Sequence, residues 1–188
     1  ETDEEIESDV VRQLRDLATD KKVFLDITTM LVYVSDVYNG GCHFEFREKV
    51  LSEQAAAERH KSALDSILPY MEGRTLITCQ SAVDDYNSIV GLLGGVDEKS
   101  RARELIERLT IVPDCVSRKF SDLAESGQIK GRSKLIFGSA DMLRCDILTS
   151  NEGFVRAAAG QGIHISAMLH EPRALSEQKK LGEASALP

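Results

Sequence analysis

The sequence predicts an α/β fold with a mainly parallel sheet, and two patterns support this prediction. Short apolar runs of the strand type alternate along the chain with longer segments whose apolar residues recur at helical spacing. Each apolar run is nearly continuous, as in strands that are buried on both faces. Because parallel strands are joined by crossover connections that are usually helices, this alternation indicates a layered α/β domain.

The first half of the chain is expected to contribute three helices and two strands. The opening helix is amphipathic, since apolar residues recur at helical spacing among charged ones. In order, the expected elements are a helix at 4–20, a strand at 23–25, a helix capped by Thr28 and ended by Asn39, Gly40 and Gly41, a helix at 48–70 that ends near Pro69, and a strand at 74–79.

The second half continues the alternation, with glycines and one proline at the boundaries. In order, the expected elements are a helix at 81–95 capped by Ser81, a polar helix at 97–109, a strand at 110–114 halted by Pro113, a helix at 115–127, mixed loop and turn at 128–139, a strand at 145–151, a helix at 152–162 and a strand at 163–169.

The chain of 188 residues is long enough for one domain with a full core. We expect a single domain over residues 1–176, with its core at about 23–170, and a flexible tail over 177–188. Because the sequence begins with Glu1 rather than Met, we expect it to be one domain of a longer protein.

Composition and charge restrict the class of function. The formal net charge is −8 and the isoelectric point is near 5.1, which argues against broad, sequence-blind nucleic-acid binding but allows a local basic rim. The four cysteines form no C-x-x-C pair, which favours free thiols in the cytoplasm or nucleus. With no apolar run near the roughly 18 residues of a membrane span, we expect no membrane association.

Acidic residues stand beside several of the predicted strands. Asp26 directly follows the first strand, and Asp85 lies in the first turns of the helix after the second. Asp141 is expected in a small-residue turn before the strand at 145–151, and Asn151 follows that strand. Ligand crevices of parallel sheets lie beyond the carboxyl ends of the strands. Since Mg²⁺ and Mn²⁺ prefer oxygen ligands, the sequence predicts one or two such ions at this edge.

Each of these residues also has a purely structural interpretation. Asp26 can begin a helix, and Asp85 can interact favourably with a helix macrodipole. Asp141 can be an exposed turn residue or a helix N-terminal acid, and Asn151 can be the N-cap of the following helix.

At these positions the sequence resembles the PIN-like nuclease superfamily. "VFLDITTML" is similar to its first motif, "SAVDDYNSI" to its second, "GSADML" to its third and "LTSNEGF" to the segment that commonly carries a fourth acid. The longer strings "EKVLSEQAAAE", "GGVDEKSRA", "SNEGFVRAAAGQGI" and "HEPRALSE" closely resemble a eukaryotic PIN-like family of unknown function, in which this domain is the C-terminal part. The resemblance runs from about Val23 to Ser176.

The resemblance implies a three-layer α/β/α sandwich and, for active members, metal-dependent hydrolysis of RNA. Residue by residue, it implies Asp26, Asp85 and Asp141 as catalytic metal ligands, with Asn151 in the place of a fourth acid. Two departures are the shorter Asp at position 85, where the family usually has Glu, and the neutral Asn at position 151.

Polar and basic residues near the acids are candidates for contacts with a substrate. Thr28, Thr149 and Ser150 adjoin the strand ends, where hydroxyl groups can position water or substrate. Lys130, Arg132 and Lys134 form a basic run that either makes a phosphate-contacting rim or is a solvated loop. The four histidines show no ligand spacing and are interpreted as structural or surface residues.

Three hypotheses follow for the function. The first is a divalent-metal-dependent endoribonuclease, motivated by the acids and the resemblance. The second is a degenerate PIN-like module that binds RNA or protein without cutting, motivated by Asn151, the short Asp85 and the acidic surface. The third is a metal-dependent phosphohydrolase that acts on a small phosphorylated molecule.

Overall fold

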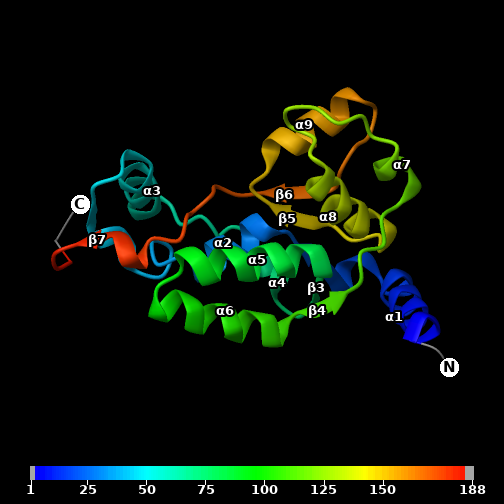
Figure 1. The fold of residues 1–188 in the computed structure, drawn as a ribbon, viewed down its shortest axis with the longest axis horizontal. Helices are drawn as coiled ribbons and strands as arrows, with labels where there is room; N and C mark the ends of the chain where they lie inside the picture. The colour runs from blue at the N-terminus through cyan, green and yellow to red at the C-terminus, as the bar shows by residue number, and fades with distance from the viewer. Residues whose placement is uncertain (1–2, 185–188) are drawn as a thin grey trace.

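The computed structural model describes residues 3–184, with side chains from Asp9 onward. It confirms the α/β fold, since five parallel strands in the order β4-β3-β1-β5-β6 form a central sheet flanked by helices, as in a three-layer α/β/α sandwich (Figure 1). The strands are β1 (Lys22–Leu25), β3 (Thr75–Cys79), β4 (Thr110–Val112), β5 (Ile147–Thr149) and β6 (Ala167–Leu169).

The central strand β1 is buried along its whole length. Phe24 pairs with Ile77 of β3 on one side and with Ile147 of β5 on the other, so the middle of the sheet is apolar on both faces. Lys22 is fully buried as well, and its Nζ donates at 2.8 Å to the carbonyl oxygens of Leu14 and Arg15. These carbonyls belong to the last turn of the first helix, so Lys22 fixes that helix to the start of the sheet.

The helices fall into groups beside particular strands. Helices α5 and α6 lie side by side as a hairpin near β3 and β4, whereas α7, α8 and α9 lie together near β5 and β6 (Figure 1). No helix of the described chain is long and apolar enough to cross a bilayer. The helices are α1 (Asp3–Asp16), α2 (Ile27–Val34), α3 (Lys49–His60), α4 (Leu68–Met71), α5 (Gln80–Leu93), α6 (Val96–Arg108), α7 (Arg118–Ser121), α8 (Gly131–Met142) and α9 (Glu152–Gly160), with short 3-10 turns η1 (Thr19–Lys21), η2 (Gly41–His43) and η3 (Glu177–Lys179).

The prediction of a single helix over 48–70 is wrong, because residues of this segment pack into two separate hydrophobic clusters. Leu51 and Ala55 of α3 pack in a small cluster apart from the main core. Leu64 and Ile67 pack in the main core. The chain therefore leaves the helix after His60 and begins the short α4 at Leu68, with Pro69 in its first turn.

The loop expected over 128–139 is also wrong, because most of this segment belongs to α8. Within α8, Gly138 is needed for packing, because a Cβ at this position would lie 2.5 Å from Cγ1 of Val116. Two other helices are shorter than expected. Helix α2 ends at Val34, before the glycines at 40 and 41, and α7 covers only four residues of 115–127.

A flexible tail was expected over residues 177–188. The chain after Arg173 is instead bound to the domain as far as Leu181. Residues 177–179 form η3, and β7 (Lys180–Leu181) pairs with β2 (Glu45–Phe46) in a two-stranded antiparallel sheet. The anchor is Glu98, a fully buried carboxylate. Its oxygens accept hydrogen bonds from four backbone N–H groups, those of Asp36, Gly95, Ser176 and Glu177, at 2.9–3.2 Å.

We expect Glu98→Gln to lower the free energy of unfolding by about 3 kcal/mol, because the amide nitrogen cannot accept hydrogen bonds and leaves buried N–H groups unpaired. Urea denaturation followed by circular dichroism measures this change. Glu104→Gln, at an exposed position of the same helix, is the matched control. A loss for Glu98→Gln no larger than that of the control would show that this carboxylate does not hold the C-terminal segment.

Candidate functional site

Asp26 lies at the carboxyl end of β1 and is the N-cap of α2. Its side chain is only 3% exposed. One oxygen, Oδ1, accepts from Thr28 Oγ1 at 2.6 Å and from the backbone N–H of Thr29 at 3.1 Å. The other, Oδ2, accepts from Thr149 Oγ1 at 2.6 Å. The helix-start interpretation of Asp26 is therefore confirmed, and Asp26 rather than Thr28 is the cap.

The end of β5 completes this polar cluster. Thr28 Oγ1 accepts from the backbone N–H of Ser150 at 2.8 Å, and Thr149 Oγ1 accepts from that of Asn151 at 2.9 Å. Both hydroxyls thus donate to Asp26 and accept from the chain after β5. The side chain of Asn151 accepts from the N–H of Phe154 at 3.1 Å and caps α9, so the N-cap interpretation is confirmed.

The pKa of Asp26 is raised above its ordinary value, mainly because burial disfavours the charged carboxylate. The hydrogen bonds from Thr149, Thr28 and Thr29 oppose this effect without cancelling it. The fold thus makes this carboxyl group harder to ionise than an exposed aspartate.

His170 joins the cluster from the end of β6, although the sequence placed it among structural or surface histidines. Its Nε2 lies 2.7 Å from Thr29 Oγ1, and its Nδ1 lies 2.9 Å from the carbonyl oxygen of Glu171. Since that carbonyl can only accept, Nδ1 carries a proton. Burial lowers the pKa of His170. The rule that located Asp26, namely the residue that directly follows a strand, would have located His170 too.

A second polar network lies at the ends of β3 and β4. Asp114, two residues after β4, accepts from the backbone N–H of Ser81 at 3.0 Å and from its hydroxyl. Arg132, in the first turn of α8, donates to Ser81 Oγ at 2.9 Å and makes an ion pair with Asp85 at 3.0 Å. Asp85 is therefore near the carboxyl edge of the sheet, as expected, but a guanidinium group already neutralises it. Asp114 was missed, although it follows a strand as Asp26 does.

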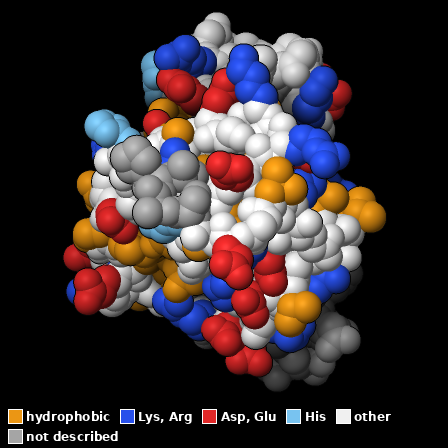
Figure 2. Space-filling model, turned by 90° about the vertical axis from the view of Figure 1, so that its left-hand side faces the viewer, with side chains coloured by type: hydrophobic (Ala, Val, Ile, Leu, Met, Phe, Trp, Pro, Cys, Tyr) orange, Lys and Arg blue, Asp and Glu red, His pale blue; other side chains and the backbone are white. Residues whose placement is uncertain are grey.

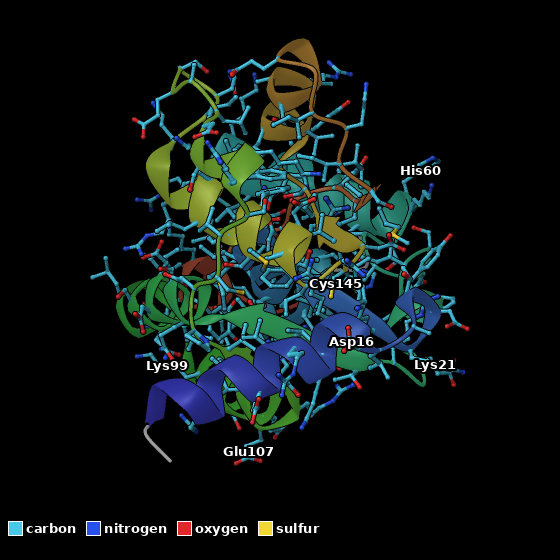
Figure 3. All side chains as sticks on the ribbon, turned by 90° about the vertical axis from the view of Figure 1, so that its right-hand side faces the viewer. Asp16, Lys21, His60, Lys99, Glu107 and Cys145 are labelled. Carbon is cyan, nitrogen blue, oxygen red and sulfur yellow. The ribbon has the colours of Figure 1, made fainter. Side chains whose placement is uncertain are left out.

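Asp141 does not lie at this edge, so the expected placement is wrong. It is in the last turn of α8, at the other end of this helix from Arg132, which contacts Ser81, and it forms an ion pair with Lys119 at 2.8 Å. It lines a pocket of about 320 Å³ together with Asp146 and Ser166, which stand just before β5 and β6. Cys145 lines the same pocket and lies on the side that carries α1 (Figure 3). Asp141 is thus near the amino edge of the sheet.

The basic run is divided between two roles. Lys130 is the exposed N-cap residue of α8, next to Arg132. Lys134 turns away, because its Nζ donates to the carbonyl oxygen of Leu123 at 2.7 Å. Only the first two of these side chains are placed to contact a ligand at the carboxyl edge.

The Asp26 cluster borders a polar pocket of about 320 Å³. His170 lines this pocket and also contacts Thr29, so it connects the pocket with the buried cluster. The other lining residues are Lys61, Ser62, Ala63, Ser66, Glu152, Leu169 and Glu171.

The residues present do not fit the expected Mg²⁺ or Mn²⁺ centre. Among the described side chains, no three His, Cys, Asp or Glu residues are grouped so that they could hold a metal ion. Asp26 is surrounded by hydroxyl groups, Asp85 is paired with Arg132, and Asp141 lies near the opposite edge. What the edge offers instead is one buried carboxyl group, several hydroxyls and a basic rim.

We expect the difference in unfolding free energy between the wild type and Asp26→Asn to fall as pH rises above the ordinary aspartate pKa of 3.8. A raised pKa means that the folded state holds the proton to higher pH than the unfolded state. Its stabilising contribution is therefore complete at low pH and is lost as pH rises through the folded-state pKa. Urea denaturation of both proteins from about pH 4 to pH 7 measures this. A difference that grows with pH would show that the hydrogen bonds outweigh burial.

Residues 23–185 match the family model described as "Protein of unknown function (DUF1308)". The match covers most of the chain, including β1 from its second residue, α8 and both polar networks. The chain belongs to this family.

Proposed function

We propose that this DUF1308 domain is a PIN-like module that binds RNA at the carboxyl edge of its sheet without cleaving it through carboxylate-bound metal. The observation that carries the proposal is the ion pair between Arg132 and Asp85. It puts a fixed positive charge where the second of the expected acids would have to receive a cation.

Electrostatics disfavour a divalent ion at this edge. A guanidinium group 3.0 Å from Asp85 offsets the negative charge of that carboxylate and repels a cation that approaches it. Both oxygens of Asp26 already accept hydrogen bonds from Thr28, Thr29 and Thr149, so a metal ion would have to displace these donors. With Asp141 near the other edge, the three expected ligands cannot converge.

The same features suit a phosphate backbone. Arg132 is half-exposed and planar, and a guanidinium of this kind can contact a phosphate while still paired on its other side. Lys130 adds an exposed charge at the start of α8, a helix of twelve residues whose N-terminus favours anions. A cluster of acidic side chains lies in the lower middle of the face seen in Figure 2, so the net charge of −8 still allows a local basic rim.

The metal-dependent endoribonuclease stands as a second candidate, because Asp26 is buried at the end of the central strand with Thr28 and Thr149 bound to it. A carboxyl group in such a place is costly to bury, and a chemical role would explain its presence. For this activity, a metal ion would have to replace Arg132 as the partner of Asp85.

Calorimetric titration with Mn²⁺ separates the two candidates. For the wild type we expect no binding at concentrations up to the order of 1 mM. Binding in the wild type that Asp26→Asn abolishes would favour the endoribonuclease. Arg132→Gln is the informative companion, since binding that occurs only in this variant would identify the guanidinium as the group that excludes the ion.

RNA binding is tested by fluorescence anisotropy with a labelled single-stranded 12-nucleotide RNA in EDTA. We expect the RNA to bind, and Lys130→Glu/Arg132→Glu to weaken binding by at least about fivefold. Arg12→Glu, on α1 and away from this edge, is the control for a reversed charge. Equal affinities for the wild type and the double variant would contradict the proposed rim.

A further inference from the structure

A groove lies at some distance from the carboxyl edge, between α2, α4 and α6. It consists of two adjoining hollows of about 440 and 340 Å³ that share Tyr33, Leu68 and Arg108 as lining residues. Glu72 precedes β3 and Arg108 precedes β4, so the groove opens toward the amino edge of the sheet. It is therefore separate from the proposed RNA site.

The floor of the groove is apolar and aromatic. Leu68, Pro69 and Met71 come from α4, and Leu105 comes from α6. Of the four tyrosines in the sequence, two line the groove and Tyr70 adjoins it at the surface, 39% exposed, whereas Tyr86 is fully buried. Tyrosine and arginine are the residue types that most often carry the binding energy of protein interfaces.

The arginines of the groove are already engaged within the domain. Arg108 donates to the hydroxyl of Tyr33, and its guanidinium lies 5.6 Å from the centre of that ring. Arg101 donates to the carbonyl oxygen of Val34 at 3.0 Å and lies 3.7 Å from a carboxylate oxygen of Asp36. The charge of Arg101 is therefore paired with a carboxylate, whereas Arg108, among the described residues, contacts only the neutral side chain of Tyr33 and keeps its charge.

The acids of the groove are not engaged. Asp65, Glu72 and Glu104 are exposed and make no hydrogen bond or ion pair with any described residue. Burial raises the pKa of the Tyr38 hydroxyl, and the negative charge of Asp65 raises it further. With three unpaired carboxylates against the single charge of Arg108, the rim of the groove carries a net negative charge, and it repels phosphate.

One aromatic ring is open to a ligand. An arginine of the domain covers Tyr33, and Arg74 lies 5.7 Å from the ring of Tyr70. Tyr38 has no such cation among the described residues, and it lies in the groove. A lysine or arginine from a partner could therefore stack on Tyr38 while it faces Asp65.

We propose that this groove docks a short basic segment of a partner protein. One large apolar side chain of the segment fills the hollow over Leu68, Met71 and Leu105, while its lysines or arginines face the three unpaired carboxylates and Tyr38. The unpaired charge decides between possible occupants, since an RNA or an acidic segment would meet repulsion. The proposal does not depend on RNA binding at the other edge.

The test begins with selection of phage-displayed 12-residue peptides on the purified 188-residue chain. We expect the selected sequences to be rich in lysine and arginine around one leucine, methionine or aromatic residue. No enrichment, or a consensus without basic residues, would overturn the proposal.

The affinity of the selected peptide, labelled with fluorescein, is then measured by anisotropy. Asp65→Lys/Glu104→Lys should weaken binding at least about tenfold, and Tyr38→Ala at least about fivefold. Asp20→Lys/Glu125→Lys, which reverses two exposed acids elsewhere, should leave it unchanged. Equal binding by the first double variant and the wild type would place the peptide elsewhere and refute the assignment. Sedimentation that shows a wild-type dimer, lost in that double variant, would assign the groove to a second copy of the chain instead.

Discussion

The direction of the connections in a parallel sheet determines which side chains of this domain can meet. Each strand ends at the carboxyl edge, and the chain must return to the amino edge before the next parallel strand begins. A residue just after a strand therefore lies at the carboxyl edge, as Asp26, Asp114 and His170 do. A residue just before a strand lies at the other edge. Asp141 stands six residues before β5, at the end of a returning helix, and this alone separates it from Asp26.

The sequence was sufficient for the five strands of the central sheet and most of the helices, because buried parallel strands leave continuous apolar runs that are easily recognised, but it did not predict β2 and β7. It was insufficient where packing overrides local signals. Residues 131–142 contain two glycines and little amphipathic pattern, yet they form α8, since Gly138 permits close contact with Val116. That one missed helix accounts for the misplaced Asp141. The pairing of Asp85 with Arg132 could not be foreseen, because the two residues lie far apart in the chain and only the fold brings them together.

The carboxyl edge is a surface whose polar groups largely satisfy one another. Thr28 and Thr149 each donate to Asp26 and accept from the backbone, Ser81 connects Asp114 with Arg132, and the Asn151 side chain is used as a helix cap. A metal centre would need oxygen atoms that are free to reorganise, whereas a closed network of this kind is rigid. The acidic groove near the other edge has the opposite character, because its carboxylates lack partners within the described fold.

The pairing of β1 also bears on how the chain is made. Its first neighbour, β3, follows within the same half of the chain, but Thr149 at the end of its second neighbour is separated from Asp26 by 123 residues. During synthesis from the N-terminus, the newly made β1 therefore has one edge open until the ribosome has produced most of the domain. Its apolar surface is exposed in that interval, and contacts over such separations form slowly. Even after β1 has paired with β3, this edge therefore stays open until β5 emerges.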